Sequence, residues 1–514
     1  MYLMAIDIGS TSIKAAVYDY YGNLAASGRR KTEVVYKDQD GRHFAFWDPD
    51  NIWNCVTGSV KEAVSSIGKP RLIKGIAVTG FACDGVPIDK NGNCLYPFIS
   101  WHDNRTLEQL EWFSKNADFK QIYKINGQKP WHLNTIFRNL WFKQNRPRLY
   151  ERIYKWLLIE DFINYKLCGE VATDYSLAST TLMLDQEKLE WSPELFDMFN
   201  LDMDIYPHPR PSGTYLGEVG AKAAEQSGLK EGTPVVLGGL DGLMGVYAAA
   251  GDQEDNLVGV IGTYEHYHKC MSRPILKEEG LGKSIICQAH IIEGKYGAYG
   301  VMVSSGVMEW FKDHLAGSEQ LMADKEKQNI WDILMQQAQE AEPGSGGIFM
   351  LPDIYGSTCP VQDNYSRGAY LGINSRSSRQ DVIRATVEGL NYKALELYKA
   401  IAGYSETESD KIIVTGGGTK NSFWMQNKAD VFGKVIEVPR IEEATPLGAA
   451  MVAGIGVGVY KDFKHAYRQV EREAVRYIPD EEKHKKYDNY FRHVYSKLYR
   501  TLKDINNYIS KQIR

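Results

Sequence analysis

A carboxylate between glycines, Asp241, is the strongest candidate for chemistry in this sequence. It follows an apolar run at 234–237 and the pair Gly238-Gly239, and Gly242 opens a helix-like stretch behind it. A carboxylate at the end of a strand can take a proton from a hydroxyl group, and the glycines would let a substrate approach the backbone. The alternative is that Asp241 only caps the helix, because Asp is a preferred N-cap residue. Further glycine-rich turns in the chain favour a catalytic role for Asp241 over a capping role.

The first of these turns begins at Asp7, in the sequence DIGSTS. The N–H and hydroxyl groups of Ser10, Thr11 and Ser12 could surround a phosphate, and Asp7 could hold Mg2+ through water molecules. Lys14 follows closely and could reach the same phosphate, although it could equally be a solvated strand residue. On its own, the turn could also be an ordinary polar hairpin.

The order of the turns is repeated in the second half of the chain. Segments 6–11 and 260–265 both join an apolar strand to a glycine and a hydroxyl residue, and segments 76–85 and 412–421 form a second matching pair. This order suggests duplication of one α/β unit, with a ligand held between the two copies.

The second half also has features typical of a nucleotide site. Three glycines at 416–418 follow an apolar strand, and their bare backbone could approach a base, a ribose or a phosphate. The run 442–453 predicts a helix of small residues that can pack close to an edge strand at 433–439. From about residue 476 the chain is charged, and we expect a helical surface tail.

Length and composition predict a multidomain globular protein. The 514 residues are too many for one core, and we expect domains at 1–250 and 251–475 with a tail at 476–514. The net charge of -5 leaves no basic footprint, so we expect no nucleic acid partner. Seven cysteines without a CxxC pair indicate reduced thiols. We also expect no signal peptide and no membrane span, and together these features favour a cytoplasmic location.

Two histidines, His266 and His268, alternate along an expected strand and could bind a metal. Because no third ligand is evident, we interpret them as polar strand positions.

The order of motifs DIGSTS, TGFACDG, SWHDNRT, GGLDG, IGT, VTGGGTKN and EEATPLGAA resembles the FGGY carbohydrate kinases of the actin-like ATPase superfamily, over residues 1 to about 460. The resemblance implies two ribonuclease-H-like α/β domains with an active-site cleft between them, the sugar deep in the cleft on the first domain and ATP mainly on the second. It implies an ATP- and Mg2+-dependent kinase acting on a primary hydroxyl of a small ketose. A possible homodimer is also implied.

Within the family, residues 76–106 together with IGTYEH and SSGVMEW are most similar to the L-fuculokinases. A xylulokinase or another pentulose or alditol kinase is the alternative. Three departures from the usual motifs leave the identity of the sugar undetermined. Leu240 stands before the catalytic position, where a histidine is common. The second phosphate turn continues as Tyr264-Glu265-His266, and residues 355–359 replace a Gly-Glu-Arg stretch.

The resemblance also implies a role for each motif residue. Asp241 matches the general base, and Asp7 and Asp241 match the carboxylates near the metal. The residues that match the sugar-contacting loops are Ala82, Cys83, Asp84, Trp101, Asp103, Arg105 and Asp241. The residues that match the ATP-binding turns are Ser10, Thr11, Ser12, Lys14, Gly262, Thr263, Gly306, Gly417, Gly418 and Asn421.

Simpler roles remain open for several of these residues. Asp84 could belong to a plain turn, Trp101 could be core, and Arg105 could simply pair with Asp103. A different class of function is also open, an actin-like ATPase that couples nucleotide state to a protein partner. The polar stretch 84–105 beside Asp241 favours a sugar kinase over that alternative.

Overall fold

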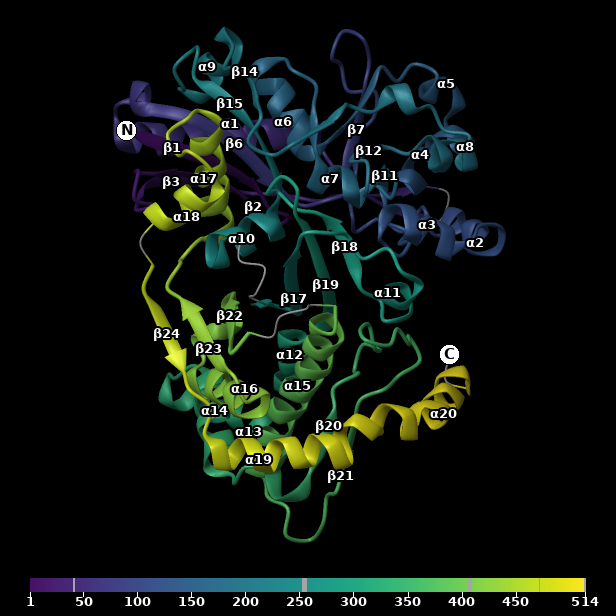
Figure 1. Ribbon diagram of the computed structural model, residues 1–514, viewed down its shortest axis with the longest axis vertical. Helices are drawn as coiled ribbons and strands as arrows, with labels where there is room; N and C mark the ends of the chain where they lie inside the picture. The colour runs from purple at the N-terminus through teal and green to yellow at the C-terminus, as the bar shows by residue number, and fades with distance from the viewer. Residues whose placement is uncertain (40–41, 252–256, 405–408, 471, 513–514) are drawn as a thin grey trace.

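The computed structural model describes residues 1–39, 42–251, 257–404, 409–470 and 472–512, and it folds into two lobes that lie one above the other in Figure 1. Each lobe is built on one central sheet. Among the described residues, no helix is both long and apolar enough to cross a membrane.

The first lobe has a six-stranded sheet in the order β14-β15-β6-β1-β2-β3. Strands β1, β6 and β15 run parallel, while β2, β3 and β14 are antiparallel to their neighbours. The bounds are β1 Tyr2–Ile8, β2 Ser12–Tyr18, β3 Leu24–Lys31, β6 Ile73–Gly80, β14 Tyr215–Glu218 and β15 Pro234–Leu240. Because β6 and β15 are buried almost throughout, they read in the sequence as short apolar runs.

The second lobe has a seven-stranded sheet in the order β18-β19-β17-β16-β22-β23-β24. Its bounds are β16 Leu257–Ile261, β17 Tyr264–Met271, β18 Ile286–Ala289, β19 Tyr296–Val303, β22 Lys411–Thr415, β23 Val435–Pro439 and β24 Ala474–Tyr477. The series β19-β17-β16-β22-β23 repeats the order and the directions of β3-β2-β1-β6-β15. The duplication predicted from the order of the turns is confirmed.

Helices cover both sheets. In the first lobe α1 packs on β2 and β3, and in the second lobe the long α15 packs on α14, α16 and β19. The bounds of the helices that shape the site are α1 Pro49–Ile67, α4 Thr135–Asn145, α6 Ile159–Cys168, α7 Tyr175–Thr180, α10 Asp241–Ala250, α12 Ser305–Leu315, α14 Ile330–Glu340, α15 Arg379–Ala402 and α16 Ser422–Phe432.

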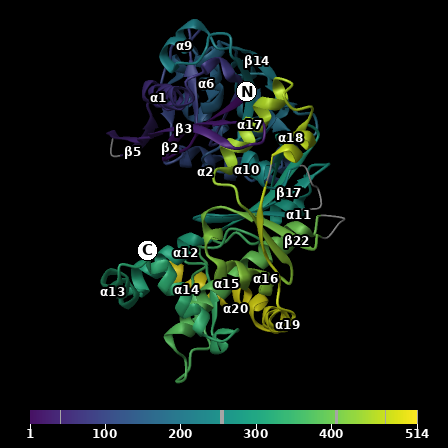
Figure 2. The ribbon, with the colours of Figure 1, turned by 90° about the vertical axis from the view of Figure 1, so that its left-hand side faces the viewer.

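The helix of small residues, α17 (Ala444–Gly456), lies elsewhere than expected. It was predicted to pack close to β23, but its main contacts are with α10 and with β1, β6 and β15 of the first lobe. Its small residues allow close packing against α10, because a Cβ on Gly448 would overlap the backbone of Met244. Figure 2 shows α17 and α18 (Phe463–Gln469) beside the first-lobe helices, from where the chain returns through β24 to the second lobe. The division at residues 250 and 475 stays a prediction.

The C-terminal segment is helical, as predicted, with α19 at Glu481–Tyr490, a π-helical turn at Phe491–Tyr495 and α20 at Ser496–Gln512. It is more than a surface tail, because Tyr487, Phe491 and Tyr495 are buried in the core of the second lobe. Their spacing of four residues places the three aromatic rings on one helix face.

Candidate active site

Asp241 lies where β15 ends and α10 begins. Leu240 is the N-cap residue and makes no side-chain cap bond, so Asp241 is not the cap of this helix. Its Oδ1 accepts a hydrogen bond from the N–H of Gly242, at 2.6 Å. Burial raises the pKa of Asp241 to about 6. A half-buried carboxylate therefore stands at the carboxyl end of a central strand, where open α/β sheets place ligands.

Asp7, on β1, lies close to Asp241. Burial and then the charge of Asp241 raise the pKa of Asp7 to about 7, while the charge of Lys14 lowers it. Lys14 itself donates to Glu443, with 2.6 Å between Nζ and Oε2. Two neighbouring carboxylates whose ionised forms are disfavoured fit a bound divalent cation, and oxygen is the ligand type that Mg2+ prefers.

A cavity of ≈ 980 Å³ runs between the lobes, lined by Asp7 and by Gly242, the residue after Asp241. The first lobe contributes Asp7 and Gly242, the second contributes Thr415 and Gly416, and Glu443 lies near the start of α17. The carboxyl ends of the central strands in both lobes therefore meet at one space, as the duplication predicts.

The glycines around Asp241 have different roles. A Cβ on Gly238 would overlap the carbonyl oxygen of Val78 on β6, and a Cβ on Gly239 would lie 2.9 Å from the Ser176 hydroxyl. Nothing lies within 4 Å of a Cβ placed on Gly242. The prediction that Gly238 and Gly239 admit substrate is therefore wrong, because strand and helix packing explains them, and Gly242 faces open space.

The first phosphate-type turn joins β1 to β2. The N–H of Gly9 donates to the carbonyl of Ser12 at 3.1 Å, while Thr11 is exposed and Ser10 half-buried. The Ser12 hydroxyl accepts from Nε of Arg29 at 2.9 Å. Arg29 on β3 brings a guanidinium group to this turn, and no motif in the sequence marks it.

The second phosphate-type turn is Gly262-Thr263, between β16 and β17. The N–H of Gly262 donates to the carbonyl of Tyr264 at 2.8 Å, and the N–H of Gly306 in α12 donates to the carbonyl of Thr263 at 3.2 Å. A Cβ on Gly306 would lie 3.3 Å from the Thr263 methyl group. Gly306 therefore supports the turn from behind.

A second pocket, of ≈ 280 Å³, adjoins the cleft and contains Gly417, Gly418 and Asn421. A Cβ on Gly417 would meet nothing within 4 Å, whereas Gly418 packs on Ile261. Asn421 caps α16, where its Oδ1 accepts from the N–H of Trp424 at 2.9 Å. Only part of the glycine turn is therefore open to a ligand.

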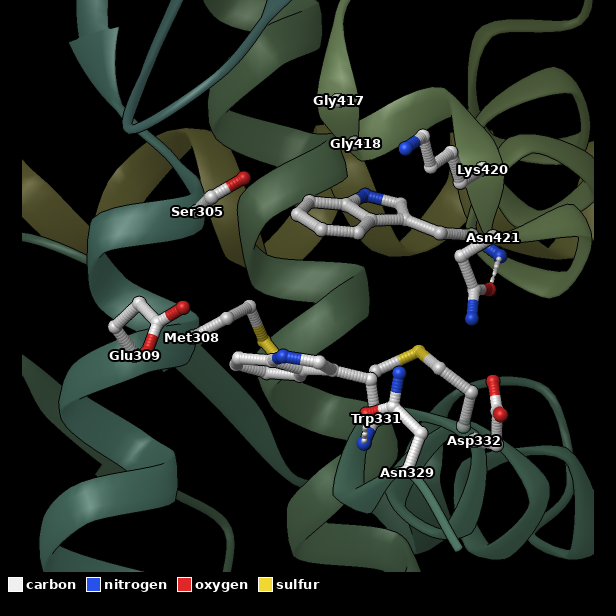
Figure 3. Close-up of a pocket in the computed structure, with 12 residues that line it drawn as sticks. Ser305, Met308, Glu309, Asn329, Trp331, Asp332, Gly417, Gly418, Lys420 and Asn421 are labelled. Carbon is white, nitrogen blue, oxygen red and sulfur yellow. Dashed lines mark hydrogen bonds between the residues drawn. The ribbon is translucent and has the colours of Figure 1, made fainter. Parts of the chain in front are cut away.

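The walls of this pocket were missed in the sequence. Trp331 of α14, Met308 of α12 and Trp424 of α16 line it, and Figure 3 shows the Met308 side chain pointing toward the ring of Trp331. An indole ring and a thioether form a flat, adaptable apolar wall for a purine base. They belong to amphipathic helices without any local motif.

Asp84 is fully buried and its oxygens are occupied by the protein. It forms an ion pair with Arg138 of α4, with 2.6 Å between Oδ1 and Nη2, and accepts from Trp47 Nε1 at 2.7 Å and from Trp101 N–H at 3.0 Å. The predicted contact of the Asp84 side chain with sugar is therefore corrected to a structural role, in which the carboxylate fixes the loops around it.

Asp103 and Arg105 also belong to the core. Their ion pair, with 2.6 Å between Oδ2 and Nη2, has both side chains fully buried, and Asp103 accepts from the N–H of Ala45 at 2.6 Å. The guanidinium group of Arg105 lies 4.1 Å from the centre of the Phe44 ring. The simpler alternative, that Arg105 pairs with Asp103, is the one that the structure shows, and it replaces the predicted sugar contacts.

Cys83 and Trp101 remain available to a ligand. Cys83 follows the half-buried Ala82 and has φ of 74°, in the left-handed region that a residue other than glycine rarely adopts. Its carbonyl accepts from Thr135 at 3.1 Å and from Arg138. Trp101 is 38% exposed and stacks on His102 with ring centres 3.8 Å apart. An exposed indole face can pack on the apolar face of a sugar.

Strand β17 explains the unusual continuation of the second phosphate turn. Glu265 points into the second-lobe core, where it pairs with Lys428 at 2.7 Å, both side chains being fully buried. His266 and His268 lie on the opposite face, and Tyr299 of β19 stacks on His268 with 4.8 Å between ring centres. Among the described residues, no group of three or more His, Cys, Asp or Glu side chains is placed to hold a metal ion, and the interpretation of the two histidines as polar strand positions stays a prediction.

Two ribonuclease-H-like lobes, duplicated in topology and separated by a cleft, define the actin-like ATPase fold. Within it, residues 2–248 match the N-terminal domain and residues 286–457 the C-terminal domain of the FGGY family of carbohydrate kinases. The chain belongs to this family, whose members are ATP-dependent, Mg2+-using phosphotransferases acting on sugar hydroxyls. The alternative of an ATPase coupled to a protein partner is set aside.

Similar proteins include an autoinducer-2 kinase of Escherichia coli (strain SMS-3-5 / SECEC), 28% identical over 502 residues that cover 95% of this chain and 92% of the relative. The L-fuculokinase of Escherichia coli (strain K12) is 26% identical over 484 residues, covering 93% and 98%. The xylulose kinase from Rhodospirillum rubrum superposes with a TM-score of 0.88 at 22% identity, covering 98% and 100%, and supports the fold.

Proposed function

We propose that the chain transfers the γ-phosphate of ATP to a primary hydroxyl of a small neutral ketose, with Asp241 as the general base. The observation that carries the proposal is the shared cleft, in which Asp7 and Gly242, the residue after Asp241, stand opposite the glycine turn of the second lobe. A pKa of about 6 leaves Asp241 mainly ionised at neutral pH, so it can accept the hydroxyl proton. Such base catalysis is typically worth roughly 10² to 10⁴ in rate.

The charge of the phosphates would be met from both lobes. Backbone N–H and hydroxyl groups at Ser10, Thr11 and Ser12 face Gly262 and Thr263 across the cleft in this proposal, and Arg29 adds a cation behind the first turn. Lys14 would exchange its bond with Glu443 for a phosphate oxygen. Mg2+, held through water by Asp7 and Asp241, would neutralise phosphate charge when bound.

The nucleotide base would occupy the pocket beside Gly417. Trp331 and Met308 supply an apolar wall of the right shape, and the open backbone of Gly417 connects this pocket to the main cleft. The phosphates would then extend from the base pocket toward Asp241, which places the γ-phosphate at the lobe boundary.

L-Fuculose is the substrate that we propose first, on the similarity to the L-fuculokinase and of residues 76–106 to that group. Autoinducer-2 is a second candidate, because a kinase named for it is 28% identical over nearly the whole chain, and D-xylulose is a third. Sugar contacts would come from Cys83, Ala82 and the exposed ring of Trp101. A cytoplasmic location and a homodimer are part of the same proposal.

An ATP-consumption screen tests this function. The purified chain would be assayed with 6-deoxyketohexoses, ketopentoses, alditols, aldonates and autoinducer-2, each with and without Mg2+. We expect Mg2+-dependent consumption that requires a sugar, with L-fuculose preferred. Hydrolysis of ATP at the same rate with and without every sugar would overturn the proposal.

A further inference from the structure

His268 is a buried side chain whose polar atoms the protein leaves unused. It lies in the middle of β17 with 5% of its surface exposed, and neither Nδ1 nor Nε2 has a hydrogen-bond partner among the described residues. Burial, together with nearby His266 and His290, holds its pKa well below the usual range, so the ring is neutral. A neutral imidazole offers one donor and one acceptor, and leaving both unmade in a protein interior is costly.

The register of the second-lobe sheet places His268 in a row of similar groups. His268 pairs with Tyr299, and His266 pairs with Val301, across the antiparallel β17 and β19. Because side chains alternate along a strand, His266, His268 and Tyr299 share one face, while Glu265 and Tyr267 face the core. The His266 and His268 rings meet edge to face, 5.6 Å apart.

This face is turned toward the proposed base. The phenol of Tyr299 is close enough to Cys83 and Asp241 for both to raise its pKa beyond the effect of burial. On the same face, a Cβ on Gly297 would lie 3.2 Å from Leu243, in the first turn of α10. The row therefore covers the start of α10 from the side of the second lobe.

We propose that His266, His268 and Tyr299 form the second-lobe wall of the sugar site, and that a substrate hydroxyl hydrogen-bonds to His268 and determines specificity there. This inference rests on the proposed function and deepens it. A hydroxyl is both a donor and an acceptor, as is the neutral imidazole, so the two are complementary. None of the three side chains is cationic, and the wall therefore suits neutral polyhydroxylated acceptors over anionic aldonates.

The test uses the full chain and the sugar that the wild type phosphorylates best, together with the series of its single-deoxy analogues. His268→Phe keeps the ring shape and removes both nitrogens. We expect the sugar KM to rise about 5-fold or more while the KM for ATP changes less than about 2-fold. One deoxy analogue that the wild type disfavours should become as good a substrate as the parent sugar for the variant.

Three further variants make the result specific. His268→Gln restores a donor and an acceptor and should recover part of the sugar affinity. Tyr299→Phe removes one oxygen, and it should raise the sugar KM even if His268→Phe fails to fold. His493→Phe, at an exposed position in the C-terminal segment, is the matched control and should behave as wild type. Thermal unfolding of each variant checks the fold.

Unchanged sugar KM and unchanged discrimination among the deoxy analogues in His268→Phe and Tyr299→Phe would overturn the inference. An equal rise in the KM values for sugar and ATP would also overturn it, because that pattern indicates general damage. Failure of the proposed function looks different. The wild type would then phosphorylate none of the sugars tested, and the inference would fail with the proposed function.

Discussion

The carboxylates of Asp7, on β1, and Asp241, at the start of α10, lie close enough that the charge of Asp241 raises the pKa of Asp7. They come from positions 234 residues apart in sequence, and the strands that lead to them flank β6 in one sheet. Such like-charge proximity is unfavourable in the free protein and becomes favourable when a cation binds between the groups. The fold therefore keeps two acids together at a cost in stability, which supports the cation site that we propose.

The first prediction concerns this cost. The pKa of Asp7 is raised from 3.8 to about 7 in the fold, so its contribution to stability is fully present below pH of about 4 and is lost as the pH rises through about 7. In Mg2+-free buffer, Asp7→Asn should therefore raise Tm over the wild type more at pH 8 than at pH 5. The variant should also lose Mg2+-dependent kinase activity. A Tm difference that does not grow with pH would contradict the assignment.

The second prediction concerns the base pocket. Trp331→Ala removes the indole wall, and because base–aromatic stacking is worth about 1–3 kcal/mol, the KM for ATP should rise roughly 5-fold or more. The sugar KM should change little. Trp112→Ala, which removes an exposed indole on the first lobe, is the matched control. Steady-state kinetics with each substrate varied in turn would measure both values, and an unchanged KM for ATP would place the base elsewhere.

The third prediction concerns the buried ion pair between Glu265 and Lys428. Lys428→Met leaves the Glu265 carboxylate uncompensated in the core, which should lower the free energy of unfolding by about 3–5 kcal/mol. Adding Glu265→Leu should recover much of this loss. Lys115→Met, at an exposed pair with Glu111, should have little effect. Urea unfolding measures all three, and a small effect of Lys428→Met alone would show that the pair is not needed.

Local chemistry in the chain predicted much of this site. The turns at Asp7, Asp241 and Gly417 are visible because glycine and a polar residue at a strand end are local signals, and their repeated order predicted the duplicated sheets. Long-range partners were invisible. Asp84 reads as a turn residue because Arg138, which neutralises it, is 54 positions away on another element.

The same limit explains the misplaced helix and the missed pocket walls. The small residues of α17 predicted close packing, but not against which surface. Its partner α10 lies some 200 residues earlier in the chain, and its partner β1 lies further away still. Trp331 and Met308 likewise look like ordinary residues of amphipathic helices. They become a binding surface only when two helices and the Gly417 turn meet.

The most direct test of the account is the rate of Asp241→Asn with ATP, Mg2+ and the best sugar all saturating, combined with calorimetric measurement of sugar binding. Asparagine keeps the size of the side chain but cannot accept the hydroxyl proton. The account predicts that kcat falls by roughly 10²- to 10⁴-fold while the sugar Kd stays within about 3-fold, and that Asp197→Asn at the surface has no effect. A variant that turns over at near the wild-type rate would contradict it.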